Sequence, residues 1–189
     1  AIRFFGEDVT EFPAQERIRR GLRRTYQISL LFSGLSVRDN VYLACRGVSR
    51  GRFSFRRPGN RDALVATAED LVRTVNLGDV MDQTVADLSY GQQRQLEIAM
   101  ALSGAPRFIL FDEPAAGLSP TERRELIGIL TGLPGHVGFI IIEHDMDVAL
   151  RVSERVTMMH NGRVFKEGKP AEIEDDPEVQ ALYLGGGHG

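Results

Sequence analysis

The sequence has one cysteine, no long apolar run and no apolar stretch at its start. Because Cys45 is the single cysteine, no disulfide can form within the chain, and we expect a reducing compartment. The apolar runs at 108–111 and 139–142 are far shorter than the roughly 20 residues that cross a bilayer. The first 12 residues include Glu7 and Asp8, which is unlike a secretory signal. These absences predict a cytoplasmic protein that does not itself cross a membrane.

The composition is that of an ordinary folded domain. The 189 residues are 42% hydrophobic and 26% charged, which fits neither a disordered nor a fibrous chain. A chain of this length is long enough to bury a hydrophobic core. We therefore expect a globular fold.

Charge is distributed unevenly along the chain. Residues 1–61 carry 13 basic and 5 acidic side chains, whereas residues 62–189 carry 10 and 21. The arginine-rich segments 17–24 and 50–57 could attract nucleic acid or anionic lipid. However, no zinc-ligand spacing, helix-turn-helix pattern or RNA-binding aromatic motif accompanies them. Solvated arginines are the simpler interpretation, and we expect no nucleic-acid partner.

Hydrophobic periodicity and turn residues predict an α/β fold. Apolar runs at 108–112 and 138–144 are flanked by helical patterns, which indicates buried strands of a parallel sheet. Asn161-Gly162 predicts a hairpin over 155–168. The other strands are expected at 2–5 and 22–27, and the other helices at 13–20, 36–45, 61–76, 92–103 and 120–131, with two short ones over 170–184.

The apolar strand predicted at 108–112 ends at Asp112, and a second acid, Glu113, follows it. Asp112 and Glu113 are therefore expected at the carboxyl edge of the sheet, where α/β folds bind ligands. This is a Walker B pattern, in which one acid supports magnesium and its neighbour orients or deprotonates the attacking water. The alternative is an ordinary strand followed by a helix-capping acid.

A serine and a glycine precede the helix predicted at 92–103. That helix, with Gln92 in its first turn and Ser89 and Gly91 just before it, would present free N–H groups to an anion. The simpler interpretation is that Ser89 is an ordinary N-cap. His144 stands at the end of the second buried strand and would lie beside Glu113, although a histidine at a strand end is often only structural. Gln27 is either a ligand on the phosphate or magnesium side or a polar loop residue.

The order of these segments resembles the ATP-binding subunit of an ABC transporter. Over nearly the whole chain, RTYQ (24–27) resembles the Q-loop, LSYGQ (88–92) the signature segment, ILFDEP (109–114) Walker B, AAGLSP (115–120) the D-loop and IIEHD (141–145) the H-loop. Within that family, the sequences LSYGQQRQLEIA, DEPAAGLSP and EHDMDVAL look most like the ATPases of branched-chain amino-acid importers. Tyr90 and Ser119 depart from the commoner glycine and aspartate, in keeping with that subgroup.

The resemblance implies a P-loop NTPase-like fold with a parallel sheet and a helical subdomain, binding ATP and Mg²⁺. It implies that Asp112 and Gln27 support magnesium, that Glu113 polarises the hydrolytic water and that His144 contacts the γ-phosphate. Two such subunits would clamp ATP head to tail and work with transmembrane permease subunits, at the inner face of the membrane. The residues that would contact nucleotide, mostly that of the second subunit, are Ser89, Tyr90, Gly91, Gln92 and Ser119.

The same resemblance implies a division of the chain. Residues 1–35 would be part of the catalytic core up to the Q-loop, 36–87 the helical subdomain, 88–169 the rest of the core and 170–189 a tail.

No GxxxxGK[ST] sequence occurs in residues 1–189, so we expect a chain shortened at its N-terminus by roughly 50 residues against a typical domain of about 200 or more. We also expect exposed apolar sheet surface and no hydrolysis by the chain alone. The alternatives are a soluble ABC-type ATPase acting on DNA or ribosomes, and a non-catalytic interaction module.

Overall fold

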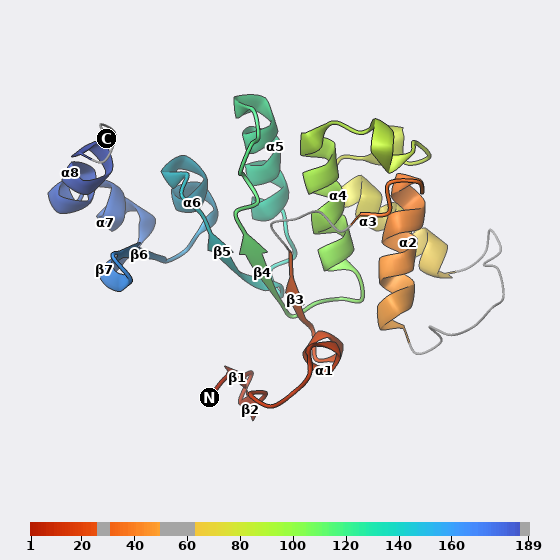
Figure 1. The fold of residues 1–189 in the computed structure, drawn as a ribbon, viewed down its shortest axis with the longest axis horizontal. Helices are drawn as coiled ribbons and strands as arrows, with labels where there is room; N and C mark the ends of the chain where they lie inside the picture. Colours follow the sequence, from red (N-terminus) through yellow and green to blue (C-terminus); the bar gives the residue numbers. More distant parts are fainter. Residues whose placement is uncertain (26–30, 50–62, 186–189) are drawn as a thin grey trace. The chain divides into compact units, whose positions relative to one another are not determined.

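The computed structural model describes residues 1–25, 31–49 and 63–185. The chain forms two compact units, residues 1–142 and residues 143–189 (Figure 1). The first unit contains a parallel sheet with its helices, and the second contains a hairpin with short helices.

The sheet of the first unit has three parallel strands. β3 (Leu22–Arg24), β4 (Phe108–Asp112) and β5 (Gly138–Ile142) pair in the order β3-β4-β5, with β4 in the centre (Figure 1). α5 (Pro120–Thr131) connects β4 to β5, as a parallel crossover requires. The predicted α/β fold with parallel strands is thus confirmed.

The two faces of this sheet differ in burial. Ile109 and Phe111 are buried, and Phe111 packs edge to face on Phe139 of β5, with 5.8 Å between ring centroids. Because successive strand residues point to opposite faces, Ile140 and Ile142 lie on the other face. Those two side chains are 54% and 60% exposed. The expected exposed apolar sheet surface is therefore present on β5.

Phe111→Ala should destabilise the fold strongly. The side chain is 1% exposed, and truncating a buried phenylalanine typically lowers the free energy of unfolding by about 3–5 kcal/mol. Urea unfolding measures the change. Ile140→Ala is the matched control on the opposite face, expected within about 0.5 kcal/mol because the side chain is exposed. Similar losses for the two variants would contradict this assignment of the sheet faces.

Three helices between β3 and β4 pack together. They are α2 (Val37–Val48), α3 (Ala63–Thr74) and α4 (Tyr90–Leu102), and they bury apolar side chains against one another. Two short 3₁₀ turns, at Gly78–Val80 and Val85–Asp87, lead into α4. The helices expected over 36–45, 61–76 and 92–103 are therefore found, with shifted ends.

The N-terminal residues form a small hairpin and one helix. β1 (Arg3–Phe4) pairs antiparallel with β2 (Glu7–Asp8), and α1 (Ala14–Arg19) follows. The turn between them contains Gly6, with a φ of 86° that glycine adopts without strain. β2 was not expected, because its two acids lack an apolar pattern.

The second unit contains the predicted hairpin. β6 (Val156–His160) and β7 (Arg163–Gly168) pair antiparallel around Asn161-Gly162, both of which have positive φ as the turn requires. α7 (Pro170–Glu174) and α8 (Pro177–Gly185) are the two short C-terminal helices.

One helix of the second unit was missed by sequence reasoning. α6 (Met146–Val152) begins after Asp145, whose Oδ1 accepts a hydrogen bond from the Val148 N–H at 3.3 Å. An aspartate three residues before that amide is a recognisable N-cap signal. Among the helices of residues 1–25, 31–49 and 63–185, none has the length and apolar character that crossing a membrane requires.

Candidate active site

Asp112 and Glu113 stand where the sequence placed them, at the carboxyl end of the central strand β4. The Asp112 N–H donates to Thr25 Oγ1 at 3.3 Å, and the Thr25 N–H donates to the Leu110 carbonyl at 2.9 Å. β3 and β5 are parallel to β4, so their carboxyl ends meet at the same edge. This edge is the usual ligand-binding position in an open α/β sheet.

Glu113 has an unusual backbone conformation. Its φ is 46°, in the left-handed region that residues with a Cβ rarely adopt. Its N–H donates to the Ile142 carbonyl of β5 at 2.9 Å, which extends the β4–β5 ladder by one residue. Such conformations concentrate at functional sites, where the surrounding structure holds them. Phe5, Asn76, Ala105 and Asn161 also have positive φ, so a functional role of Glu113 stays a prediction.

The Asp112 carboxylate is paired with Arg24 of β3. Arg24 Nη2 donates to Asp112 Oδ2 at 2.8 Å, and the side chains are 54% and 27% exposed. The register pairs Arg24 with Leu110, two residues before Asp112, so both side chains lie on one face of the sheet. An ion pair this exposed is weak, and another cation can replace the guanidinium.

The donor chemistry of Asp112 fits magnesium. Carboxylate oxygens are hard ligands, and Mg²⁺ is usually held by one or two carboxylates together with substrate phosphates. In the described parts of the chain no cluster of three or more metal-binding side chains occurs. When bound, magnesium would neutralise charge on the phosphates. Gln27, the other predicted magnesium ligand, lies outside the described residues.

Ser89 is the N-cap of α4. Its Oγ accepts from the Gln92 N–H at 3.2 Å, and Gln92 Oε1 accepts from the Ser89 N–H at 2.9 Å. This reciprocal capping box matches the simpler interpretation of Ser89. A role of Ser89 or Gln92 toward nucleotide stays a prediction.

Tyr90 is held by a buried arginine that sequence reasoning did not identify. Its hydroxyl accepts from Arg94 Nη2 at 2.7 Å and Nε at 3.1 Å, and Arg94 also pairs with Glu97 at 2.8 Å. The spacing of four residues along α4 could have suggested this contact.

Ser119 is the N-cap of α5, where it forms a second capping box with Glu122. Glu122 Oε1 also accepts from the Gly91 N–H at 3.1 Å. The structure therefore brings the signature segment (88–92) and the D-loop (115–120) together. The pattern of serine followed three residues later by glutamate predicts the cap, but nothing local predicts the bond to Gly91.

His144 lies in the second unit, in the turn that precedes α6. The following residue, Asp145, caps that helix, which gives it a structural role. The expected position of His144 beside Glu113 stays a prediction.

Several arginines of the basic segment 17–24 are engaged within the fold. Arg17 donates to the carbonyls of Val9 and Thr10, and Arg20 pairs with Glu7. Arg23 is buried and donates to the Ser103 carbonyl at 3.2 Å. These contacts favour a structural role over an open nucleic-acid surface. The second basic segment, 50–57, lies outside the described residues.

Comparison with known proteins identifies the family. Residues 1–116 match the ABC transporter family. The chain is 34% identical to the high-affinity branched-chain amino acid transport ATP-binding protein BraF of Pseudomonas aeruginosa, over 97% of this chain and 75% of BraF. It is 35% identical to the lipopolysaccharide export system ATP-binding protein LptB of Acidithiobacillus ferridurans, over 94% of this chain and 70% of LptB.

A solved structure agrees. The crystal structure of MJ1267, an ATP-binding cassette of an ABC transporter in its ADP conformation, matches with a TM-score of 0.78 and 27% identity. The match covers 96% of this chain and 75% of MJ1267. The chain belongs to the ABC transporter family, among its ATP-binding subunits.

Proposed function

We propose that this chain belongs to the ATP-binding and ATP-hydrolysing subunit that powers an ABC importer for branched-chain amino acids. The observation that carries the proposal is the placement of Asp112 and Glu113 at the carboxyl edge of the sheet, with the signature segment held against the D-loop. The similarity to BraF, over nearly the whole chain, supports the choice of solute.

The proposed chemistry divides the work among a few side chains. Asp112, now paired with Arg24, would hold magnesium, and Glu113 accepts a proton from the attacking water or orients it. His144 contacts the γ-phosphate, and Gln27 senses that phosphate and relays its state to the permease. ATP and Mg²⁺ are the cofactors of this reaction.

A second ABC ATPase subunit, identical or different, completes the site in this proposal. The two subunits clamp ATP head to tail, so Ser89, Tyr90, Gly91 and Gln92 serve mainly the nucleotide bound by the other subunit. Ser119 in the D-loop lies near the same boundary. Phosphate release should then rise more steeply than linearly with subunit concentration.

Residues 1–189 contain no GxxxxGK[ST] sequence, so they need that phosphate-binding segment to complete the site. We propose that the 189 residues alone do not hydrolyse ATP. The chain would act at the inner face of the membrane, as a peripheral subunit on its permease.

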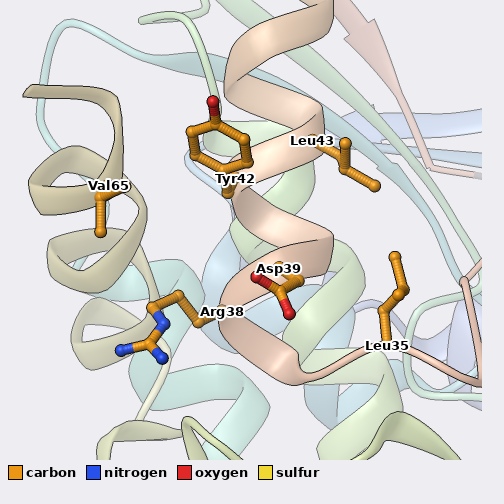
Figure 2. A pocket seen from close by; sticks show the side chains of 6 residues that line it. All are labelled: Leu35, Arg38, Asp39, Tyr42, Leu43 and Val65. Carbon is orange, nitrogen blue, oxygen red and sulfur yellow. The ribbon is translucent and has the colours of Figure 1, made fainter. Parts of the chain in front are cut away.

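The helical region 36–87 is the proposed contact with the permease. α2 and α3 border a hollow of about 280 Å³, where Leu43 and Leu35 are 39% and 38% exposed (Figure 2). Figure 2 shows Val65 of α3 at its other side. Arg38, Asp39 and Tyr42 also line the hollow, so it suits an amphipathic helix of a partner protein.

Leu43→Asp should therefore reduce co-purification with the permease by about tenfold or more, because a buried unpaired carboxylate opposes association. Ile18→Asp on α1 is the matched control, since Ile18 is 37% exposed and lies outside this region. Quantitative pull-down of the permease measures both. Equal retention of permease by the two variants would move the interface elsewhere.

Binding tests distinguish the proposed importer from an ATPase acting on DNA or ribosomes and from a lipopolysaccharide exporter. An ATPase acting on DNA or ribosomes should bind duplex nucleic acid tightly, with affinity that falls steeply as salt rises. We expect no submicromolar binding in a gel-shift titration at physiological salt. The 35% identity to LptB favours lipopolysaccharide export as the second candidate, and the permease that co-purifies with the chain distinguishes the two transport functions.

A further inference from the structure

We propose that Glu122 is a positioning residue that couples the signature segment to the D-loop, so that the two segments move as one body. Its consequence for ATP turnover rests on the proposed function, but the coupling itself is a property of this fold.

The coupling is carried by one carboxylate that serves two helices. Glu122 Oε1 accepts from the Gly91 N–H of α4 at 3.1 Å, and Oε2 accepts from the Ser119 N–H at the start of α5 at 2.9 Å. The N–H groups at helix starts have no partner within their own helix. One side chain therefore satisfies a donor in the signature segment and another in the D-loop, and Glu122 lies 31 residues from Gly91 along the chain.

Gly91 permits the close approach that this bond needs. A Cβ at position 91 would lie 2.2 Å from Glu122 Oε1 and 2.5 Å from Cδ, well inside contact distance. On helix propensity alone, alanine at position 91 would be more favourable than glycine by roughly 1 kcal/mol. Any side chain at 91 would push the carboxylate away from the signature segment.

Two further features tie these regions together: the D-loop approaches the Tyr90 ring closely, and a second hydrogen bond joins α4 to α5. A Cβ at Gly117 of the D-loop would lie 3.2 Å from Cε1 of the Tyr90 ring, and Gly117 has a φ of 76°. Gln95 Nε2 of α4 donates to Glu125 Oε2 of α5 at 3.1 Å. These contacts limit how far α4 and α5 can separate, and Glu122 is the contact that reaches both helix starts.

The charge on Glu122 strengthens the junction. The pKa of its carboxyl lies below the usual range, chiefly through hydrogen bonds from the Ser119 side chain and backbone, with a further contribution from the Gly91 N–H. The carboxylate is thus ionised at neutral pH, where it faces the positive ends of two helix dipoles. Hydrogen bonds to a charged acceptor are roughly twice as strong as neutral ones.

The simpler explanation is that Glu122 only caps its own helix. A capping-box glutamate needs one bond, to the N–H of the capping serine. The bond to Gly91 is additional and joins a different helix. A test must therefore perturb one segment and record the response in the other.

Amide hydrogen exchange of the 189-residue chain, followed residue by residue by NMR, provides that test. In Glu122→Gln we expect exchange to accelerate about fivefold at both Gly91 and Ser119, because the charged acceptor is lost. Ser119→Ala is the matched control: it removes the hydroxyl that caps α5 but leaves the carboxylate, so the Gly91 amide should keep its wild-type rate.

Gly91→Ala tests the reverse direction. Its Cβ displaces the carboxylate, so exchange should accelerate at Ser119 although the substitution lies in α4. In the double variant Gly91→Ala/Glu122→Gln, exchange at Ser119 should be no faster than in the single variant with the larger effect. The reason is that both substitutions remove the same contact.

Unchanged exchange at Gly91 in folded Glu122→Gln would overturn the proposal, and so would additive effects in the double variant. If Glu122→Gln does not fold, an unchanged Ser119 rate in Gly91→Ala would overturn it as well. None of these measurements needs nucleotide or permease. A failed coupling is thus distinguishable from a failed assignment as an importer ATPase.

Discussion

Glu113→Gln is expected to lower ATP turnover about 10²- to 10⁴-fold, the usual loss when a general base is removed. The measurement is phosphate release at saturating MgATP, in an assembly that contains this chain together with a GxxxxGK[ST] segment. Glutamine keeps the shape of the side chain but cannot accept the proton. It also keeps the Cβ, so the backbone conformation at φ 46° is not relieved. ATP binding, measured by calorimetry, should change little.

Glu167→Gln is the control for this prediction. Glu167 lies in the hairpin of the second unit, where it pairs with Arg155 at 3.0 Å on the surface. Removing that pair should leave turnover unchanged, because exposed ion pairs contribute little. An unaltered turnover number in Glu113→Gln would remove Glu113 from the chemistry.

The 189 residues alone should bind MgATP weakly at best and release no measurable phosphate. In P-loop enzymes, backbone N–H groups and a lysine hold the β- and γ-phosphates, and positioning with electrostatics supplies nearly all the catalysis. Asp112 and Glu113 are acids that would repel a triphosphate without such a segment. Losing even one preorganised donor elsewhere slows catalysis about 10²- to 10³-fold.

Isothermal titration of the purified chain with MgATP measures this binding. The matched variant is again Glu113→Gln, which separates the chain's own hydrolysis from a contaminating ATPase. Micromolar affinity combined with phosphate release that Glu113→Gln abolishes would contradict the prediction. Heat below detection and identical background release in both proteins would agree with it.

The sequence alone was enough for most of the fold because its strongest signals are local. The apolar runs that became β4 and β5 are continuous and flanked by helices, and Asn161-Gly162 suits only a tight hairpin. Ser89 could be placed at a helix start because capping requires residues only three positions apart. The position of Asp112 at the end of β4, and of Glu113 directly after it, could be inferred from the position of that strand.

Three of the features that sequence reasoning missed depend on residues far apart in the chain. The Arg24–Asp112 pair joins positions 88 residues apart and needs the register of β3 on β4. The Glu122–Gly91 bond needs two helix starts to meet. The positive φ of Glu113 arises where β4 ends against β5. A residue pattern within one segment cannot predict contacts between segments that are distant in the sequence.

The left-handed backbone at Glu113 creates a conflict between the stability of the fold and the proposed ATP turnover. A glycine there would avoid the Cβ penalty of a left-handed residue, of the order of 1–2 kcal/mol, and would keep the hydrogen bond to Ile142. It would also delete the proposed base. A library selected only for thermal resistance or expression should accordingly accumulate Gly at position 113, whereas one selected for transport should exclude it. A screen for stability alone would then replace the residue on which the proposed hydrolysis depends.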